Sequence, residues 1–246
     1  MQSLRLALGC LTIVPVGPRS APSDQAFGRS WIWFPLIGLL IGVILVGAHH
    51  LFTRWLPPFV ATALILSVWV WLTGALHLDG LADVCDALYG GRTPDARLRI
   101  MKDPHLGTMA VVALSVHLLL KFAMLHSLPP SEVVPTLLLV PCLSRYAMVI
   151  PGTTLPYART EDGAAARFVR HATMSSLLMA TLAALLLSWL IAGRRGLGLC
   201  GVGGVAALIA RGVFFRTLGG ITGDALGATG EIVESVLLLS LLLLSA

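Results

Sequence analysis

The chain is dominated by long apolar runs that alternate with short polar segments. A run of about 20 apolar residues spans the hydrocarbon core of a bilayer as an α-helix, and helices satisfy their own backbone hydrogen bonds in lipid. The sequence therefore predicts an all-α, polytopic integral membrane helical bundle. We expect about seven transmembrane helices, over residues 31–52, 59–78, 106–128, 133–150, 172–192, 197–215 and 228–244.

Composition supports this class and excludes others. The chain is 57% hydrophobic and 12% charged, which is too little polar material to coat a soluble globule. Its basic residues are scattered between apolar runs, so the formal net charge of +5 does not predict nucleic-acid binding. The four cysteines form no CxxC pair and are expected to be structural thiols. We expect one membrane-embedded domain over 1–246, with 1–30 as an amphipathic segment on the membrane surface.

The basic residues of the connecting segments predict the orientation. With a cytoplasmic N-terminus, eleven arginines and lysines lie on the cytoplasmic side and three on the other, in agreement with the positive-inside rule. This topology places segments 79–105, 152–171 and 216–230 on the cytoplasmic face, with every carboxylate except Glu132. We therefore expect these three segments to form a site there.

The first of these segments holds three aspartates directly after an apolar run. Asp79, Asp83 and Asp86 are spaced i, i+4 and i+7, which places them on one face of a helix. Carboxylates beside hydrocarbon are costly unless a cation compensates them, and oxygen ligands favour Mg²⁺, with Mn²⁺ as a substitute. A solvated helix start is the alternative for the aspartates. The preceding His77 fits a hydrogen bond within the bundle as well as a substrate contact.

The second segment, residues 97–108, is basic. Arg97, Arg99 and Lys102 offer cationic groups to phosphate oxygens, and Asp103 follows them. The same cations can instead anchor the chain to anionic lipid headgroups. Their position some twenty residues after the aspartates, in the same loop, favours phosphate.

The third segment, residues 216–234, combines glycines with acids. Five glycines within twelve residues weaken a helix and allow the backbone to approach a ligand closely. If a helix continues through the segment, Asp224, Glu231 and Glu234 share one face. A close helix–helix contact through small residues is the alternative for the glycines, and both interpretations can hold together.

Four polar residues inside the expected spans have no carboxylate partner within a span in this topology. They are His117, Lys121, Arg145 and Arg211. A charged side chain inside a bilayer is expensive unless it reaches the interface or meets a compensating group. Snorkelling to the interface and contact with a substrate are the two explanations.

Taken alone, these residues predict a class of reaction. Carboxylates for a metal, cations for phosphate and a Gly-rich wall suit phosphoryl transfer from a diphosphate-activated donor. The sequence contains no Walker A, GxSxG or HExxH motif. A CDP-alcohol phosphotransferase is an alternative, but its D-G-x2-A-R pattern is absent because Val84 follows Ala82 and Asp83. A transporter is the non-enzymatic alternative, and it would place carboxylates near the bilayer midplane.

Six stretches of the chain also resemble those of a known family. They are residues 11–16, 34–42, 76–86, 100–108, 157–159 and 216–228, which read LTIVPV, FPLIGLLIG, LHLDGLADVCD, IMKDPHLGT, YAR and RTLGGITGDALGA. In combination and order they are similar to the cobalamin synthase family, the adenosylcobinamide-GDP ribazoletransferases. Where that family often has Gly after the third aspartate, this chain has Ala87, which removes no ligand.

The resemblance implies a reaction and a set of roles. In that family a ribazole hydroxyl attacks the phosphoryl group attached to adenosylcobinamide, GMP leaves, and adenosylcobalamin or its 5′-phosphate forms with Mg²⁺ as cofactor. Metal binding is implied for Asp79, Asp83, Asp86 and Asp224, with Asp83 or Asp224 as the catalytic base. Substrate or phosphate binding is implied for His77, Lys102, Asp103, Arg159, Arg216, Glu231 and Glu234, whose acids can equally orient the cations.

The resemblance also implies partners and a location. The substrates would be adenosylcobinamide-GDP and α-ribazole or its 5′-phosphate. The protein would lie in the cytoplasmic (inner) membrane of a prokaryote, in contact with the lipid bilayer, with its N-terminus and active face toward the cytoplasm. Other corrinoid-pathway enzymes or a second copy of the chain are the expected protein partners.

Overall fold

The structure is a computed structural model, and it describes residues 1–16, 21–160, 163 and 165–245. Three charged residues that the sequence places on the cytoplasmic side, Arg19, Glu161 and Asp162, lie outside the described residues. The described chain is helical without a β-strand, which confirms the predicted all-α class. Its elements are α1 (Gln2–Leu11), α2 (Asp24–Ser30), η1 (Trp31–Trp33), α3 (Phe34–Thr53), α4 (Pro58–Leu72), α5 (Leu76–Gly90), α6 (Pro94–Ile100), α7 (Thr108–His126), α8 (Pro130–Thr154), α9 (Ala166–Arg170), α10 (Met174–Leu218) and α11 (Gly223–Ser245).

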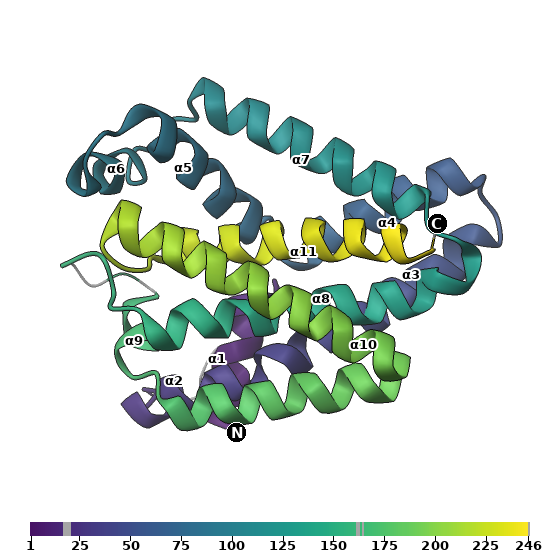
Figure 1. Ribbon diagram of the computed structural model, residues 1–246, viewed down its shortest axis with the longest axis horizontal. Helices are drawn as coiled ribbons and strands as arrows, with labels where there is room; N and C mark the ends of the chain where they lie inside the picture. The colour runs from purple at the N-terminus through teal and green to yellow at the C-terminus, as the bar shows by residue number, and fades with distance from the viewer. Residues whose placement is uncertain (17–20, 161–162, 164, 246) are drawn as a thin grey trace.

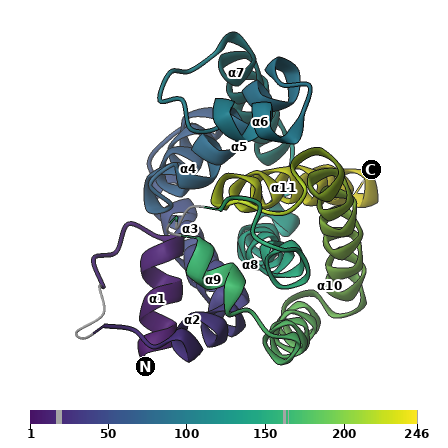
Figure 2. The same cartoon turned by 90° about the vertical axis from the view of Figure 1, so that its left-hand side faces the viewer.

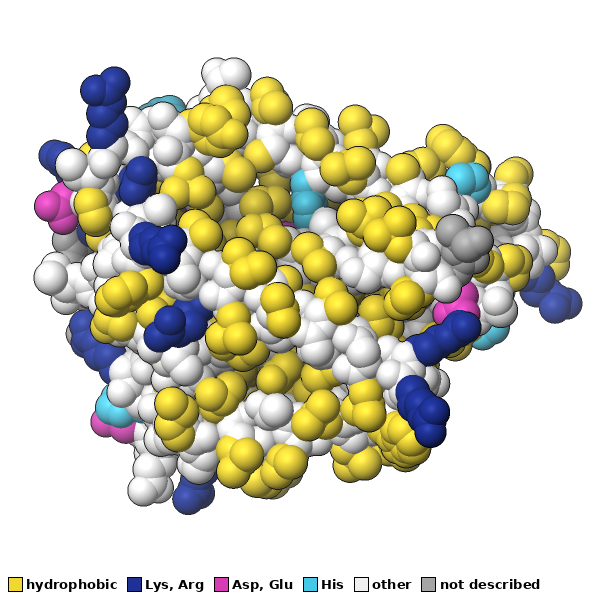
Figure 3. All heavy atoms as spheres, viewed as in Figure 1, with side chains coloured by type: hydrophobic (Ala, Val, Ile, Leu, Met, Phe, Trp, Pro, Cys, Tyr) yellow, Lys and Arg dark blue, Asp and Glu magenta, His cyan; other side chains and the backbone are white. Residues whose placement is uncertain are grey.

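Apolar side chains cover the middle of the molecular surface. Figure 3 shows them over α7, α10 and α11, whereas lysine and arginine side chains gather at the two ends. Leu119, Leu186 and Leu243 are among the exposed residues, each more than half accessible. Soluble monomers rarely expose contiguous apolar surface on this scale. The apolar surface and the long apolar helices identify a membrane protein.

Among the described residues, five helical stretches are long and apolar enough to cross a membrane. They are Asp24–Thr53, Thr108–His126, Pro130–Thr154, Met174–Leu218 and Gly223–Leu244. The bent pair α4 and α5 makes a sixth if it counts as one span. The predicted number of seven is therefore not confirmed.

Helix α10 contains two of the predicted spans. A straight helix of its 45 residues would be about 67 Å long, which exceeds the roughly 30 Å of a hydrocarbon core. Its backbone leaves helical geometry at Ala192 and at Gly193, where φ is 55°. The chain folds back there (Figure 1), and Gly196 comes to lie against Ser188. The two predicted spans thus form the two arms of a hairpin.

The predicted span 59–78 is wrong in its extent. Helix α4 ends at Leu72, and α5 starts at Leu76 with a bend of 85° between the two. Gly74 and Ala75 cause the break, because both adopt left-handed backbone conformations with φ of 61° and 56°. Apolar periodicity does not report such a break. As a result α5 begins inside the bundle and carries the aspartates toward one end.

Helix α8 forms the centre of the bundle. Figure 2 shows it surrounded by other helices, and it packs on α3, α10 and α11. Helix α3 approaches it through two glycines: a Cβ on Gly38 would lie 2.2 Å from the carbonyl oxygen of Pro141, and one on Gly42 would lie 2.5 Å from that of Leu137. Small residues permit such close packing of membrane helices. Stretch 34–42 therefore fixes α3 against the central helix.

We expect Gly42→Ala to lower the thermal unfolding midpoint of the detergent-solubilised protein. The added methyl group meets the α8 backbone, and overpacking of this kind costs about 1–3 kcal/mol. The matched control is Gly47→Ala on the same helix, because nothing lies within 4 Å of a Cβ there. An unchanged midpoint for Gly42→Ala would contradict the close packing of α3 on α8.

Candidate active site

Helices α5 and α11 cross at two glycines. A Cβ on Gly80 would lie 2.5 Å from the carbonyl oxygen of Asp224, and one on Gly227 would lie 3.0 Å from the Cα of His77. The crossing brings two acidic segments together although more than a hundred residues separate them. Asp83 consequently interacts electrostatically with Asp79 and Asp224. The close helix–helix contact is thus present, and it brings the acids of both segments near one another.

A short backbone bridge holds Arg159 beside Asp224. The amide of Ala158 donates to the carbonyl of Ile221 at 2.9 Å, and the amide of Ile221 donates to the carbonyl of Pro156 at 2.9 Å. The loop after α8 is thereby fixed to the turn before α11. Arg159 Nη2 donates to Asp224 Oδ2 at 2.8 Å, and the two side chains stay 18% and 24% exposed. This ion pair joins two of the predicted cytoplasmic segments, 152–171 and 216–230.

A small basic cavity of about 220 Å³ lies beside Arg159. Arg99 and Lys102 line it together with Arg159, so three cations and one acid, Asp95, surround one space. Lys102 and Arg159, two of the residues for which the resemblance implied phosphate binding, thus line the same cavity, and Arg99 lines it too. Arg97, which was also a phosphate candidate, instead donates from Nη1 to the carbonyl of Thr217 at 3.0 Å and ties α6 to the end of α10.

Asp103 and Arg216 lie at the same end but in exposed positions. Asp103 Oδ1 accepts a hydrogen bond from the amide of His105 at 3.0 Å and lies 2.6 Å from His105 Nδ1. The hydrogen bond with the His105 side chain lowers the pKa of Asp103. In this structure Asp103 therefore pairs with His105.

Asp86 serves as the cap of another helix. Its Oδ2 accepts from the amide of Gly107 at 2.6 Å, and its Oδ1 accepts from the amide of Ala110 at 2.8 Å. The residue at the N-cap of α7 is glycine, which has no side chain for this purpose. A carboxylate at a helix N-terminus satisfies free amides and favours the helix dipole. The sequence predicted Asp86 as a metal ligand. In the structure its carboxylate instead caps the N-terminus of α7.

The remaining carboxylates suit a magnesium ion that is shared with a substrate. Within the described part of the chain, no three His, Cys, Asp or Glu side chains are grouped closely enough to hold a metal by themselves. Mg²⁺ is commonly bound through one or two carboxylates together with waters and substrate phosphates. Asp79 is exposed, and Asp83 and Asp224 are partly exposed, so their oxygens can be reached from outside. This donor set fits an ion that arrives with a diphosphate.

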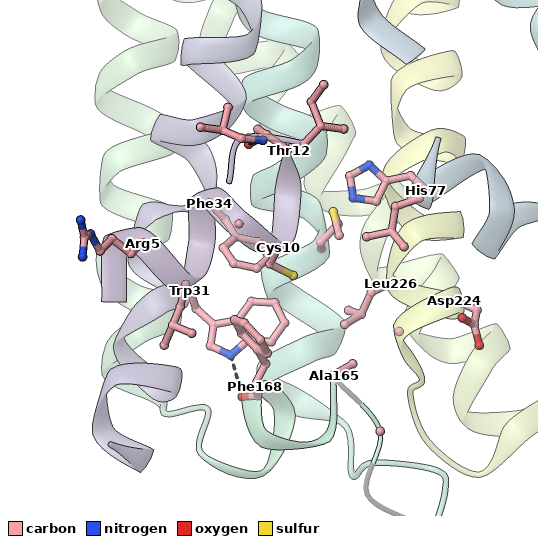
Figure 4. Close-up of a pocket in the computed structure, with 18 of the residues that line it drawn as sticks. Arg5, Cys10, Thr12, Trp31, Phe34, His77, Ala165, Phe168, Asp224 and Leu226 are labelled. Atoms are coloured by element: carbon pink, nitrogen blue, oxygen red, sulfur yellow. Dashed lines mark hydrogen bonds between the residues drawn. The ribbon is translucent and has the colours of Figure 1, made fainter. Parts of the chain in front are cut away.

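A larger cavity of about 810 Å³ also reaches the Arg159–Asp224 pair (Figure 4). Its wall is mostly apolar and includes Cys10, Trp31, Phe34, Phe168 and Leu226. His77 reaches it from α5; the side chain is buried, and its Nδ1 has no hydrogen-bond partner. Helix α1 forms one side of the cavity, a contribution that sequence reasoning missed because it treated residues 1–30 only as a surface segment.

Buried ion pairs join α7, α8 and α11. Lys121 Nζ lies 3.0 Å from Glu231 Oε2 and also pairs with Glu234, which in turn pairs with Arg145. His117 Nε2 lies 2.8 Å from the same oxygen of Glu231. The expectation that Lys121, Arg145 and His117 lack an in-span carboxylate partner is therefore wrong. Both glutamates lie in the first turns of the expected span 228–244. Two acids and two bases, Lys121 and Arg145, therefore lay within the expected spans, and this match in number was the signal that they pair.

These pairs place Glu231 and Glu234 with cations of the bundle interior, not with Lys102, Arg159 or Arg216. Arg211, the fourth polar residue of the expected spans, donates from Nε to Thr154 Oγ1 at 2.9 Å. Its partner is thus a hydroxyl group at the end of α8. The buried ion pairs and the Arg211–Thr154 hydrogen bond both hold neighbouring helices together.

We expect Lys121→Met to destabilise the protein strongly, because two glutamates would then face only one buried cation. Breaking a buried ion pair from one side costs about 3–5 kcal/mol. Adding Glu231→Gln restores charge balance and should recover much of the loss. Unfolding of both variants in detergent measures this. A double variant no more stable than Lys121→Met would show that the two side chains do not interact.

Comparison with known proteins identifies the family. A family model described as cobalamin-5-phosphate synthase matches residues 3–242. The chain belongs to this family. No solved structure matches the chain significantly.

Curated relatives agree with this assignment over nearly their whole length. The adenosylcobinamide-GDP ribazoletransferase of Pseudomonas paraeruginosa is 42% identical over 253 residues, covering 99% of this chain and 98% of that protein. The protein of the same name from Acinetobacter baumannii is 39% identical over 237 residues, covering 95% and 94%. That from Geotalea daltonii is 36% identical over 236 residues, covering 96% and 95%.

Proposed function

We propose that the protein transfers α-ribazole, or its 5′-phosphate, onto adenosylcobinamide-GDP with release of GMP. The product is adenosylcobalamin or its 5′-phosphate. One observation carries the proposal: the Arg159–Asp224 pair lies at the α5–α11 crossing, where a basic cavity and an apolar cavity meet. Such a junction can hold a charged donor on one side and an acceptor on the other. The relatives' names support this activity over a CDP-alcohol phosphotransferase or a transporter.

The basic cavity is the proposed place of the donor diphosphate. Arg99 and Arg159 present guanidinium groups, and Lys102 adds a point charge. Together they neutralise the phosphate oxygens and the charge that develops on departing GMP, which is the main requirement of phosphoryl transfer. Arg216, exposed at the same end, is a further phosphate contact in this proposal.

Asp79 and Asp224 would hold Mg²⁺, with Mn²⁺ as a substitute, together with the diphosphate oxygens. When bound, the ion would supply charge neutralisation and orientation of the phosphoryl group. Asp224 already accepts a hydrogen bond from Arg159, which makes it a weaker base than Asp83. Asp83 is therefore the proposed acceptor of the ribazole hydroxyl proton, and Asp86 keeps α7 in place.

The active face is proposed to lie toward the cytoplasm of a prokaryotic cell, with the protein in the inner membrane and its N-terminus inside. The predicted site segments lie at one end of the bundle, and more basic side chains gather there than at the other end (Figure 3). Positive-inside bias assigns that end to the cytoplasm. Both proposed substrates would reach the site from this side.

The direct test incubates the purified protein with adenosylcobinamide-GDP, α-ribazole and Mg²⁺. Release of GMP together with formation of a cobalamin is the expected result, and chromatography detects both. Absence of both products would reject the proposal and direct attention to lipid phosphotransferases.

We expect Asp83→Asn to lower turnover by at least about 100-fold, because general base catalysis contributes roughly 10²–10⁴-fold. Its thermal unfolding midpoint should stay close to that of the wild type. Glu132→Gln is the matched control, since this carboxylate pairs with Arg195, remote from both cavities, and its loss should leave turnover unchanged. Turnover of Asp83→Asn at the wild-type rate would reject its assignment.

Metal removal gives a second test of the proposed chemistry. Dialysis against a strong chelator should abolish turnover, and added Mg²⁺ or Mn²⁺ should restore it. Calcium serves as a control, because it prefers more ligands and longer bonds than this small donor set offers. Full activity after thorough chelation would rule out a metal-dependent mechanism.

A further inference from the structure

We infer that the apolar cavity holds the aromatic base of the ribazole acceptor, with His77 as its hydrogen-bonding partner. This inference rests on the proposed function and deepens it, because it assigns one of the two substrates to a specific cavity. It also gives helix α1 a role as a wall of the acceptor site. Size, wall chemistry, an unpartnered polar atom and a residue shared with the basic cavity carry the assignment.

The size of the cavity suits the acceptor better than the donor. Pockets for drug-sized ligands measure roughly 300–1,000 Å³, and this cavity of about 810 Å³ lies in that range. A benzimidazole nucleoside is a ligand of that size. Adenosylcobinamide-GDP combines a corrin macrocycle, an adenosyl group and a guanosine diphosphate, and amide groups surround its ring. Such a molecule exceeds the cavity, and an apolar wall would leave its amides without partners.

Aromatic side chains form one part of the wall. The rings of Trp31 and Phe34 lie with centroids 4.6 Å apart, and Phe168 meets Trp31 edge to face at 6.3 Å. Trp31 Nε1 donates to the carbonyl of Phe168 at 2.9 Å, which fixes the indole ring. Rigid aromatic rings pack well against a planar base in offset or edge-to-face geometry. Figure 4 shows these three residues on one side of the cavity and His77 on the other.

His77 supplies the polar contact that an acceptor base needs. The side chain is only 2% exposed, and its Nδ1 has no hydrogen-bond partner in the structure. Buried polar atoms are nearly always paired, so the unpaired Nδ1 of a residue that lines the cavity leaves a hydrogen-bonding position for a ligand atom to fill. A base nitrogen or a ribose hydroxyl would satisfy it. The α5–α11 crossing at Gly227 holds the backbone of His77 firmly in place.

The residue that the two cavities share sets the direction of the bound acceptor. Arg159 lines both the apolar cavity and the basic cavity, and Asp224 lines the apolar cavity beside it. A base held deep against Trp31 and His77 would therefore direct its ribose toward Asp224 and the carboxylates of α5. In the transfer step a ribose hydroxyl oxygen forms the bond to phosphorus, the bond to the GMP oxygen breaks, and Asp83 takes the hydroxyl proton. The attacking oxygen thus comes from one cavity and the phosphoryl group from the other.

Gly9 of α1 offers a way to fill the cavity without disturbing the fold. It lines the cavity, and nothing lies within 4 Å of a Cβ built on it. Leucine is also favoured over glycine within a helix. We expect Gly9→Leu to raise the KM for α-ribazole at least tenfold, while the KM for adenosylcobinamide-GDP changes by less than twofold. Gly47→Leu, the same change at an open position of α3, should leave both constants unchanged.

Binding of α-ribazole without the donor separates this inference from the proposed function. Calorimetry should show wild-type protein binding α-ribazole, with affinity reduced at least tenfold in Gly9→Leu and in His77→Phe, which keeps a ring but removes Nδ1. If wild-type protein forms no cobalamin, the proposed function fails. If it does, but Gly9→Leu raises the donor KM or changes neither constant, the cavity assignment is overturned. A tightly bound membrane lipid that α-ribazole does not displace from the cavity would overturn it as well.

Discussion

The close crossing of α5 and α11 is the contact on which the site depends. Gly80 and Gly227 leave no room for a side chain there, so the backbones touch and the aspartates of α5 come beside Asp224. A Cβ at Gly80 would push the helices apart and separate the carboxylates, and one at Gly227 would press on the backbone of His77. The bend at Gly74 and Ala75 is equally necessary, because it directs α5 along α11. The glycines that permit close packing thus also position the acids of the site.

Buried charges keep α11 in register for this crossing. Glu231 and Glu234 lie two to three turns beyond Asp224 and are paired with Lys121 of α7 and Arg145 of α8. In a low-dielectric interior such pairs tolerate little displacement, because an unpaired charge is very costly. A shift of α11 by one turn would break them. The ion pairs therefore fix the position of α11 along its axis, and with it the place where Asp224 contacts α5.

Sequence reasoning predicted the helical membrane fold, the helix that carries Asp79 and Asp83, and the convergence of three segments at one end. These follow from apolar run length, helical periodicity and charge bias, which are local properties of the chain. It missed the break at Ala75, because positive φ in alanine leaves no signal in an apolar pattern. It also missed the capping contact of Asp86 and the wall formed by α1, because both depend on which elements meet in three dimensions.

The central claim is that α5 and α11 together bind one divalent ion with the donor diphosphate. Electron paramagnetic resonance of Mn²⁺, titrated into the protein with adenosylcobinamide-GDP present, tests this directly. The account predicts that Asp79→Asn on α5 and Asp224→Asn on α11 each weaken Mn²⁺ binding, and that their combined effect is less than additive in free energy because they share one ion. Wild-type Mn²⁺ affinity in Asp224→Asn would contradict it.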